Sequence, residues 1–322
     1  MPVSPIEPPS LTEIETARAA LRDVLVPTPL VPLHMHGADE GIWLKPEILQ
    51  PAGSFKIRGI FHAALRLAPE RRARGLSTVS AGNTAKALAW CGRHFGVSAR
   101  SLMPEGAPAT KVATVRALGG TPVLVPTAEV FRFLKEHAWE REPYAFIHPW
   151  TDRDVHTGHA TLGLELLEAC PEVETVFVPL GGGGLFTGVA SALRARQPSV
   201  RVVAVEPASC PHFAAALAAG KPVDVPCQTM CDGVAVPYLT AELFPLLREL
   251  ATTVVSVTEA EVRAAIRVLA NGNHLIAEEA GALATAAALK TPRDQRGRTV
   301  ALVTGGSIDS PRLCQILSEN DA

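Results

Sequence analysis

Residues 53–59 read Gly-Ser-Phe-Lys-Ile-Arg-Gly, which places one lysine, Lys56, between small residues and the expected start of a helix. Three other glycine-containing turns accompany it: residues 80–84 read Ser-Ala-Gly-Asn-Thr, residues 181–185 read Gly-Gly-Gly-Gly-Leu, and residues 304–307 read Thr-Gly-Gly-Ser. Each turn alone has an ordinary interpretation, because a lysine after Ser-Phe is by default a solvated charge and a glycine run is by default a flexible turn. Together the four turns indicate a cofactor site.

Short β-rich segments alternate with alanine- and leucine-rich segments along most of the chain. Continuously apolar strands separated by helices are typical of parallel sheets covered on both faces, so the pattern predicts an α/β fold. The expected strands are 76–80, 100–103, 122–125, 175–180, 202–206, 252–257 and 299–304. The expected helices are 57–67, 85–95, 109–118, 155–169, 185–196, 259–270 and 279–289. The proline-rich first nine residues are expected to be loose.

Three of the four turns stand at the ends of expected strands. The tetraglycine follows the strand 175–180, and the turn 80–84 follows the strand 76–80. Thr304 closes the last strand. Ligands of α/β sheets bind at the carboxyl ends of strands, where the loop leads into a helix, so these turns are expected to share one site. The alternative is that they are three unrelated tight turns.

The tetraglycine loop can bend so that successive backbone N–H groups point inward as an anion-binding nest, and the following helix adds its positive N-terminal end. A phosphate group fits such a nest. A Walker-type P-loop needs Gly-Lys-Ser/Thr where this chain has Gly184-Leu185-Phe186, so nucleotide hydrolysis is disfavoured. A dinucleotide motif is matched only loosely, through Gly188.

In this order and at these separations, the four turns resemble those of pyridoxal-phosphate (PLP) enzymes of fold type II, the β-family, and within it the threonine/serine dehydratase and serine racemase branch. The resemblance runs from about Pro29 to Asp309. It implies a two-lobed fold similar to the tryptophan synthase β subunit. The large PLP-binding domain would be discontinuous, comprising residues 1–68 and 150–322, and residues 69–149 would form a small mobile domain.

The resemblance also implies the roles of the cofactor-binding residues. Lys56 would form the Schiff base with PLP and, once displaced by the substrate, would act as a base. Asn83 would bond the phenolic oxygen, the tetraglycine loop would bind the phosphate, and Thr304 would face the pyridine nitrogen. A neutral hydroxyl cannot hold that nitrogen protonated, which favours loss of a β-substituent over transamination. The implied cofactor-binding residues are Lys56, Asn83, Gly181, Gly182, Gly183, Gly184, Leu185 and Thr304.

In the family the turn matching 80–84 binds the substrate carboxylate, which assigns that role to Ser80, Ala81, Gly82 and Thr84. Serine racemases carry a serine at the position of Ala81, where it acts as a second base; a methyl group cannot move protons, so racemisation is not expected. Thr84 replaces the usual histidine and Lys86 the usual glutamine, which leaves the substrate range open. Trp150 stands where dehydratases often have an aromatic residue and racemases an asparagine.

Metal sites are weakly indicated. Glu206 matches one ligand of the divalent-cation site in some relatives, but the other two positions are Cys210 and His212, so a magnesium or calcium site stays an open alternative. Cys227-x3-Cys231 has zinc-like spacing without a second cysteine pair, and buried thiols are expected instead. A histidine and aspartate cluster is expected to pack or line a pocket rather than bind metal; its members are His148, Asp152, Asp154, His156 and His159.

Composition limits the partners. With 30 basic and 32 acidic residues in 322, no charge excess favours nucleic acid or an anionic membrane, and a small amino-acid substrate is the expected ligand. No apolar run approaches the roughly 20 residues that cross a bilayer. The N-terminus lacks the features of a signal peptide, so a cytoplasmic location is expected. A homodimer is expected by analogy with the family, and isoleucine regulation is not, because little sequence follows Thr304.

These observations predict a PLP-dependent ammonia-lyase that converts a β-hydroxy-α-amino acid, L-threonine or L-serine, to a 2-oxo acid and ammonia. Three alternatives stay open: a dehydratase for a bulkier substrate such as 3-hydroxyaspartate or phenylserine, a serine racemase, and a non-catalytic PLP-binding protein that kept the fold.

Overall fold

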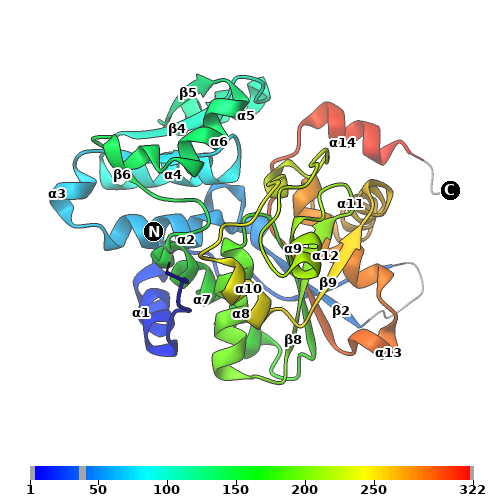
Figure 1. The fold of residues 1–322 in the computed structure, drawn as a ribbon. Coiled ribbons are helices and arrows are strands. Elements are labelled where there is room, and N and C mark those ends of the chain that lie inside the picture. Colours follow the sequence, from blue (N-terminus) through cyan, green and yellow to red (C-terminus); the bar gives the residue numbers. More distant parts are fainter. Residues whose placement is uncertain (1–3, 36–40, 320–322) are drawn as a thin grey trace.

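The computed structural model describes residues 4–35 and 41–319, which form two lobes, each built on its own sheet (Figure 1). The strands are β1 Val31–Pro32, β2 Ile42–Pro46, β3 Leu76–Val79, β4 Ala99–Pro104, β5 Thr121–Val125, β6 Ala145–Phe146, β7 Thr175–Pro179, β8 Arg201–Pro207, β9 Thr253–Val257 and β10 Thr299–Val303. The helices are α1 Leu11–Leu21, α2 Lys56–Arg66, α3 Pro69–Arg72, α4 Asn83–Phe95, α5 Ala109–Ala117, α6 Thr127–Lys135, α7 Arg153–Ala169, α8 Gly184–Arg196, α9 His212–Ala219, α10 Phe244–Leu250, α11 Glu259–Asn273, α12 Glu279–Lys290, α13 Arg293–Arg296 and α14 Ser310–Leu317. Short 3-10 turns cover Glu47–Leu49, Pro51–Gly53, Ala138–Arg141 and Asp232–Val234.

The larger sheet has the strand order β1-β2-β10-β7-β8-β9 and is parallel except for the pair β1 and β2. Helices cover both of its faces. Val176 and Val178 of β7 face one core with α7, α8 and α10, while Phe177 faces the other core with α11 and α12. Because successive side chains of a strand point to opposite faces, a strand buried on both faces must be apolar throughout, as β7 is.

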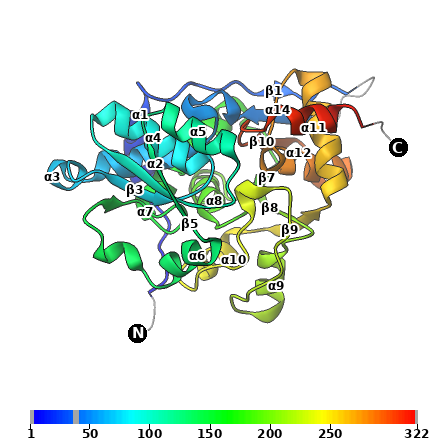
Figure 2. The same ribbon diagram turned by 90° about the horizontal axis from the view of Figure 1, so that it is seen from above.

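The smaller sheet has the order β5-β4-β3-β6, and its strands are all parallel. Helices α4, α5 and α6 pack on it, and α2 contacts α4 on one side and α7 on the other. Figure 2 shows this sheet lying beside the larger lobe, with α2 and α7 between them. The carboxyl ends of β3 and β7 therefore face a common region between the lobes.

All the strands and helices predicted from the sequence are present, with ends shifted by a few residues. The missed elements are mostly short, and β1 and β6 have two residues each, too few to show a period. The expectation of loose N-terminal residues is wrong for those described: the Ile6 N–H donates to the Glu242 carbonyl, and Ser10 caps α1. The strands of the smaller sheet lie between residues 76 and 146, and the domain boundaries stay a prediction.

The cysteine expectation needs a correction. Cys210 and Cys227 form a disulfide, because the chain after β8 and the loop before Cys231 bring their Cα atoms to 4.3 Å. Cys91, Cys170 and Cys231 are buried thiols. In the part of the chain that the structure describes, no helix is both long and apolar enough to cross a membrane.

Candidate active site

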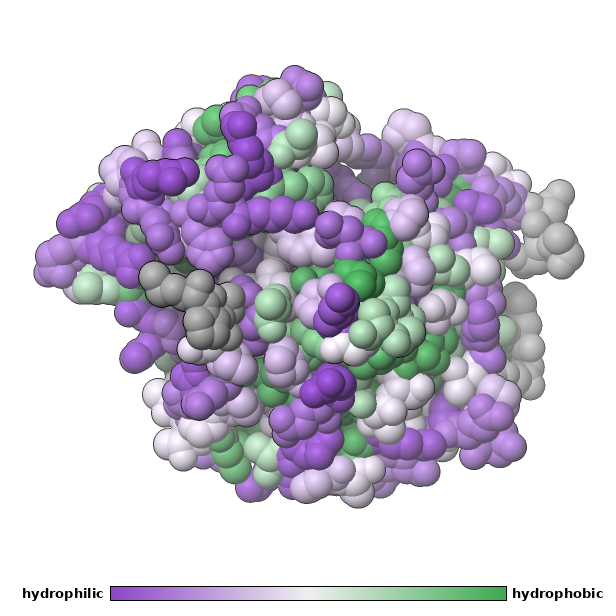
Figure 3. Space-filling model, in the orientation of Figure 1, coloured by the Kyte–Doolittle hydropathy of each residue, from purple (hydrophilic) through white to green (hydrophobic). Residues whose placement is uncertain are grey.

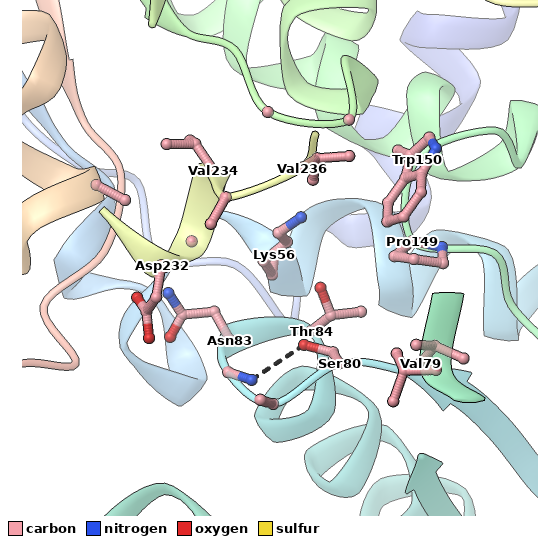
Figure 4. Close-up of a pocket in the computed structure, with 18 of the residues that line it drawn as sticks. Lys56, Val79, Ser80, Asn83, Thr84, Pro149, Trp150, Asp232, Val234 and Val236 are labelled. Atoms are coloured by element: carbon pink, nitrogen blue, oxygen red, sulfur yellow. Dashed lines mark hydrogen bonds between the residues drawn. The ribbon is translucent and has the colours of Figure 1, made fainter. Parts of the chain in front are cut away.

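A cavity of about 570 Å³ lies between the two lobes (Figure 4). The structure brings to its wall every residue that the sequence selected for cofactor and substrate, from five separate segments. These residues are Lys56, Ser80, Ala81, Gly82, Asn83, Thr84, Gly181, Gly182, Gly183, Gly184, Leu185 and Thr304. In Figure 3 the surface is hollowed between the lobe of the smaller sheet and the rest of the molecule. The turns are therefore not unrelated.

Lys56 is the first residue of α2, and its amine points into the cavity (Figure 4). Burial lowers the pKa of Lys56 to about 8, and the carboxylate of Glu278 only partly opposes this shift. The start of α2 is fixed by Arg58, whose buried guanidinium donates to Glu47 at 2.6 Å and to Glu165 at 2.7 Å. A lysine with this pKa has an appreciable neutral fraction near neutral pH, as a nucleophile or base requires.

The tetraglycine loop joins β7 to α8. The backbone N–H groups of Gly181 to Gly184 donate no hydrogen bond to any residue that the structure describes, and Gly183 and Gly184 are buried. Unpaired N–H groups at a helix N-terminus are what an anion needs. Gly183 has φ +97°, and a Cβ at Gly182 would come within 2.4 Å of the Trp150 ring, so larger residues do not fit. The loop fits the phosphate expected from the sequence.

The turn 80–84 joins β3 to α4, which begins at Asn83. The Gly82 N–H donates to the Ser80 hydroxyl at 3.1 Å, the dashed line in Figure 4, and the Ser101 hydroxyl donates to the Ser80 carbonyl at 2.8 Å. The turn is thus held from the neighbouring strand β4. It presents its hydroxyls and the first N–H groups of α4 beside Lys56, a suitable position for a substrate carboxylate.

Asn83 belongs to a polar network that closes one end of the cavity. Its amide donates to Glu278 at 2.5 Å and its oxygen accepts from Ser307 at 2.7 Å, and Lys86 donates to the same Ser307 hydroxyl at 2.7 Å. Burial raises the pKa of the Glu278 carboxyl to about 7. Thr304 lies nearby, buried, with its hydroxyl 3.4 Å from the Ala280 carbonyl.

Sequence reasoning missed Glu278 and an apolar wall. Glu278 precedes α12 with no glycine turn beside it, so only its place before a predicted helix could have drawn attention to it. The apolar wall comes from α6 and from the chain around the 3-10 turn 232–234; its members include Val130, Phe131, Leu134, Val234 and Val236. Nothing in the sequence indicated that α6, a surface-like helix, would face a ligand.

The histidine cluster packs as expected. His148 accepts from the Thr151 N–H at 3.0 Å, His156 bonds the Trp150 carbonyl at 2.7 Å, and the His159 ring lies 4.8 Å from the Phe55 ring. Burial lowers the pKa of His148 to about 3 and that of His156 to about 4. Among residues 4–35 and 41–319, no group of three His, Cys, Asp or Glu residues could hold a metal ion.

Glu206, the cation candidate, has a different set of partners. Its carboxylate accepts the backbone N–H groups of Phe213 at 2.9 Å and Ala214 at 3.1 Å, and it lies 3.7 Å from His212 Nδ1. Cys210, at a second position of the expected cation site, is in the disulfide. These contacts use the carboxylate to hold the start of α9, and they do not support a cation site.

The chain is similar to known proteins over most of its length. Residues 21–305 match the family described as pyridoxal-phosphate dependent enzyme. The L-threonine ammonia-lyase of Thermotoga maritima is 36% identical over 317 residues, which cover 96% of this chain and 78% of the relative. The catabolic L-threonine dehydratase of Escherichia coli K12 is 35% identical over 291 residues, 87% of each chain.

Solved structures agree. Maize serine racemase superposes with a TM-score of 0.88 at 30% identity, covering 96% of this chain and 97% of that one. The threonine deaminase of T.th. superposes with a TM-score of 0.84 at 35% identity, covering 94% and 99%. The predicted fold type II architecture is confirmed. With one family matched over most of the sequence and a phosphate-sized nest beside a lysine in one cavity, this chain belongs to the family of pyridoxal-phosphate dependent enzymes.

Proposed function

We propose that this protein is a PLP-dependent ammonia-lyase that converts L-threonine or L-serine to 2-oxobutanoate or pyruvate and ammonia. The observation that carries the proposal is the convergence of Lys56, the turn 80–84 and the tetraglycine loop on one cavity. The relatives named L-threonine ammonia-lyase and threonine dehydratase, similar over most of this chain, support the choice of substrate.

In this proposal the cofactor is held by the residues that the resemblance selects. The free N–H groups of the tetraglycine loop bind its phosphate, Asn83 and Thr304 bond the ring, and Lys56 makes the covalent attachment. When bound, PLP supplies an electron sink that stabilises negative charge at the substrate α-carbon. The Glu278 carboxyl, with a pKa of about 7, adjusts the charge around Asn83.

The chain's own residues then orient the substrate and move its proton. The Ser80 and Thr84 hydroxyls and the N-terminus of α4 bind the carboxylate, which fixes the α-carbon near the Lys56 amine. Neutral Lys56 accepts the α-proton, and its low pKa makes the neutral form available. The apolar wall around Trp150 excludes water from that proton transfer.

The test is an assay for ammonia and 2-oxo acid with a panel of β-hydroxy amino acids. We expect equal amounts of both products from L-threonine or L-serine. A protein that binds PLP but releases ammonia from no member of the panel would contradict the proposal and favour a non-catalytic PLP-binding protein.

A second candidate is a dehydratase for a bulkier hydroxy amino acid. It is favoured by the apolar wall, in which Val130 and Phe131 of α6 face the cavity together with Trp150. Such a wall suits an aryl group such as that of phenylserine and does not suit the second carboxylate of 3-hydroxyaspartate. A higher kcat/KM for phenylserine than for threonine in the same panel would select this candidate.

Racemisation tests the role of Ala81. We expect wild-type protein to form pyruvate from L-serine without comparable D-serine, because the Ala81 methyl cannot deliver a proton on the face opposite Lys56. Ala81→Ser is expected to raise D-serine formation from near zero. The measurement is chiral analysis alongside the pyruvate assay, with Thr84→Val as a control for the nearest other hydroxyl of the turn. D-serine at a rate comparable with pyruvate in the wild type would favour the racemase.

The pKa of Lys56 predicts a pH dependence. We expect apoprotein to attach PLP faster as the pH rises through about 8, because the amine attacks the aldehyde only when neutral and burial lowers its pKa to about 8. Below that pH the amine is protonated and the rate falls; above it the rate levels off. The initial growth of visible absorbance at a series of pH values measures this. A rate still rising at pH 10.5, the ordinary lysine value, would contradict it.

We also propose a homodimer, a cytoplasmic location and a small domain, residues 69–149, that moves against the rest of the chain. Light scattering measures the first. The location is tested by the thiol state of Cys210 and Cys227 in cell extracts, since a reducing cytoplasm disfavours their disulfide. Scattering with and without substrate tests the domain motion.

A further inference from the structure

His212, the first residue of α9, contacts the tetraglycine loop from outside the cavity. Its Nε2 lies 2.8 Å from the Gly181 carbonyl oxygen, and its Nδ1 lies 3.1 Å from the Cys210 carbonyl oxygen. The side chain is fully buried, and His212 is not among the residues that line the cavity. A carbonyl oxygen can only accept, so the imidazole Nε2–H donates to Gly181.

This bond fixes one peptide plane of the loop. In a planar trans peptide the carbonyl of Gly181 and the N–H of Gly182 point in opposite directions, and the described residues contain no cis peptide. A carbonyl held toward His212 therefore turns the Gly182 N–H toward the cavity that Gly182 lines. Without such a restraint, a peptide between two glycines can rotate, because glycine accepts both signs of φ.

His212 is itself held firmly. Glu206 in β8 accepts the N–H groups of Phe213 and Ala214, which fixes the first turn of α9, and its carboxylate lies 3.7 Å from His212 Nδ1. Glu206 and His212 are both fully buried. The sequence Glu206, His212, Gly181 is thus a continuous chain of contacts that ends at the peptide in question.

We propose that His212 is a positioning residue of the cofactor site: its Nε2–H holds the Gly181 carbonyl and so aims the Gly182 N–H at the cofactor phosphate. This inference rests on the proposed phosphate role of the tetraglycine loop. It predicts that loss of the Nε2 donor weakens the binding of the phosphate and leaves the binding of the rest of the cofactor unchanged.

The test compares two variants and two ligands. His212→Gln keeps an N–H donor close to the position of Nε2, whereas His212→Asn keeps one only near the position of Nδ1. Dissociation constants of the apoproteins are measured for PLP and for pyridoxal, which lacks the phosphate. We expect His212→Asn to bind PLP about tenfold more weakly, the loss of one hydrogen bond to a buried group, with pyridoxal affinity unchanged. His212→Gln should stay close to wild type.

The outcomes separate two failures. If wild-type protein has no preference for PLP over pyridoxal, the phosphate role of the loop is wrong. If the wild type has that preference and His212→Asn keeps it, or if the variant loses affinity for both ligands equally, the positioning role of His212 is wrong. His62→Asn removes another buried histidine, one bonded to the Asp154 carbonyl away from the cavity, and should not change the preference.

Should the His212→Asn apoprotein fail to fold, the same comparison is made on loaded protein. The release of PLP into buffer with an excess of a PLP-binding acceptor is then expected to be about tenfold faster from His212→Asn than from His212→Gln. Equal release rates would overturn the positioning role.

Discussion

Replacing Lys56 by alanine is expected to abolish the visible absorbance of covalently attached cofactor and to lower turnover by more than about a thousandfold. Lys56 begins α2 with its amine in the cavity and has a pKa lowered to about 8. The other lysines nearby are engaged: Lys111 pairs with Asp232, and Lys86 donates to Ser307. Neither is free to replace it.

The absorbance spectrum and the ammonia assay of the purified variant measure this prediction. Lys111→Ala is the matched control, because Lys111 also lines the cavity, and it should keep the absorbance of attached cofactor. If Lys56→Ala retained both the absorbance and ammonia release, another amine would be the attachment site. Thermal melting of the two apoproteins checks that neither result reflects misfolding.

Much of this molecule could be predicted from local sequence because its strands are buried on both faces. β7 and β10 are apolar at nearly every position, and each helix that follows a strand begins within a few residues of its expected start. Parallel strands bring their carboxyl ends to one edge. The turns at 80–84 and 181–185 were therefore expected to share a site before any distance was known, and they line one cavity.

Other parts of the site depend on contacts between distant segments, which local sequence does not encode. Glu278 meets Asn83 across 195 positions, and His212 meets Gly181 across 31. Neither contact leaves a periodic or spacing signal. The disulfide of Cys210 depends likewise on two loops that approach only in the folded chain. Sequence reasoning identified the residues on glycine turns and missed the residues that hold those turns.

Gly182→Asp is expected to weaken PLP binding by about a thousandfold beyond any effect of its size. Two unit charges about 4 Å apart at an effective dielectric constant near 20 repel by about 4 kcal/mol, which is about a thousandfold in affinity. A carboxylate in the tetraglycine loop would stand among the N–H groups that are expected to bind the phosphate. The new Cβ would also come within 2.4 Å of the Trp150 ring, so part of the effect is steric.

Gly182→Asn separates the two causes, because asparagine has the size of aspartate without its charge. The clash with Trp150 is common to both variants and should lower the melting temperature of both apoproteins by similar amounts. The repulsion is specific to Gly182→Asp, and it should appear only with the phosphorylated ligand, so pyridoxal should bind the two variants equally. If the two variants bound PLP equally, charge at this loop would not matter, and the cofactor phosphate would have to lie elsewhere in the cavity.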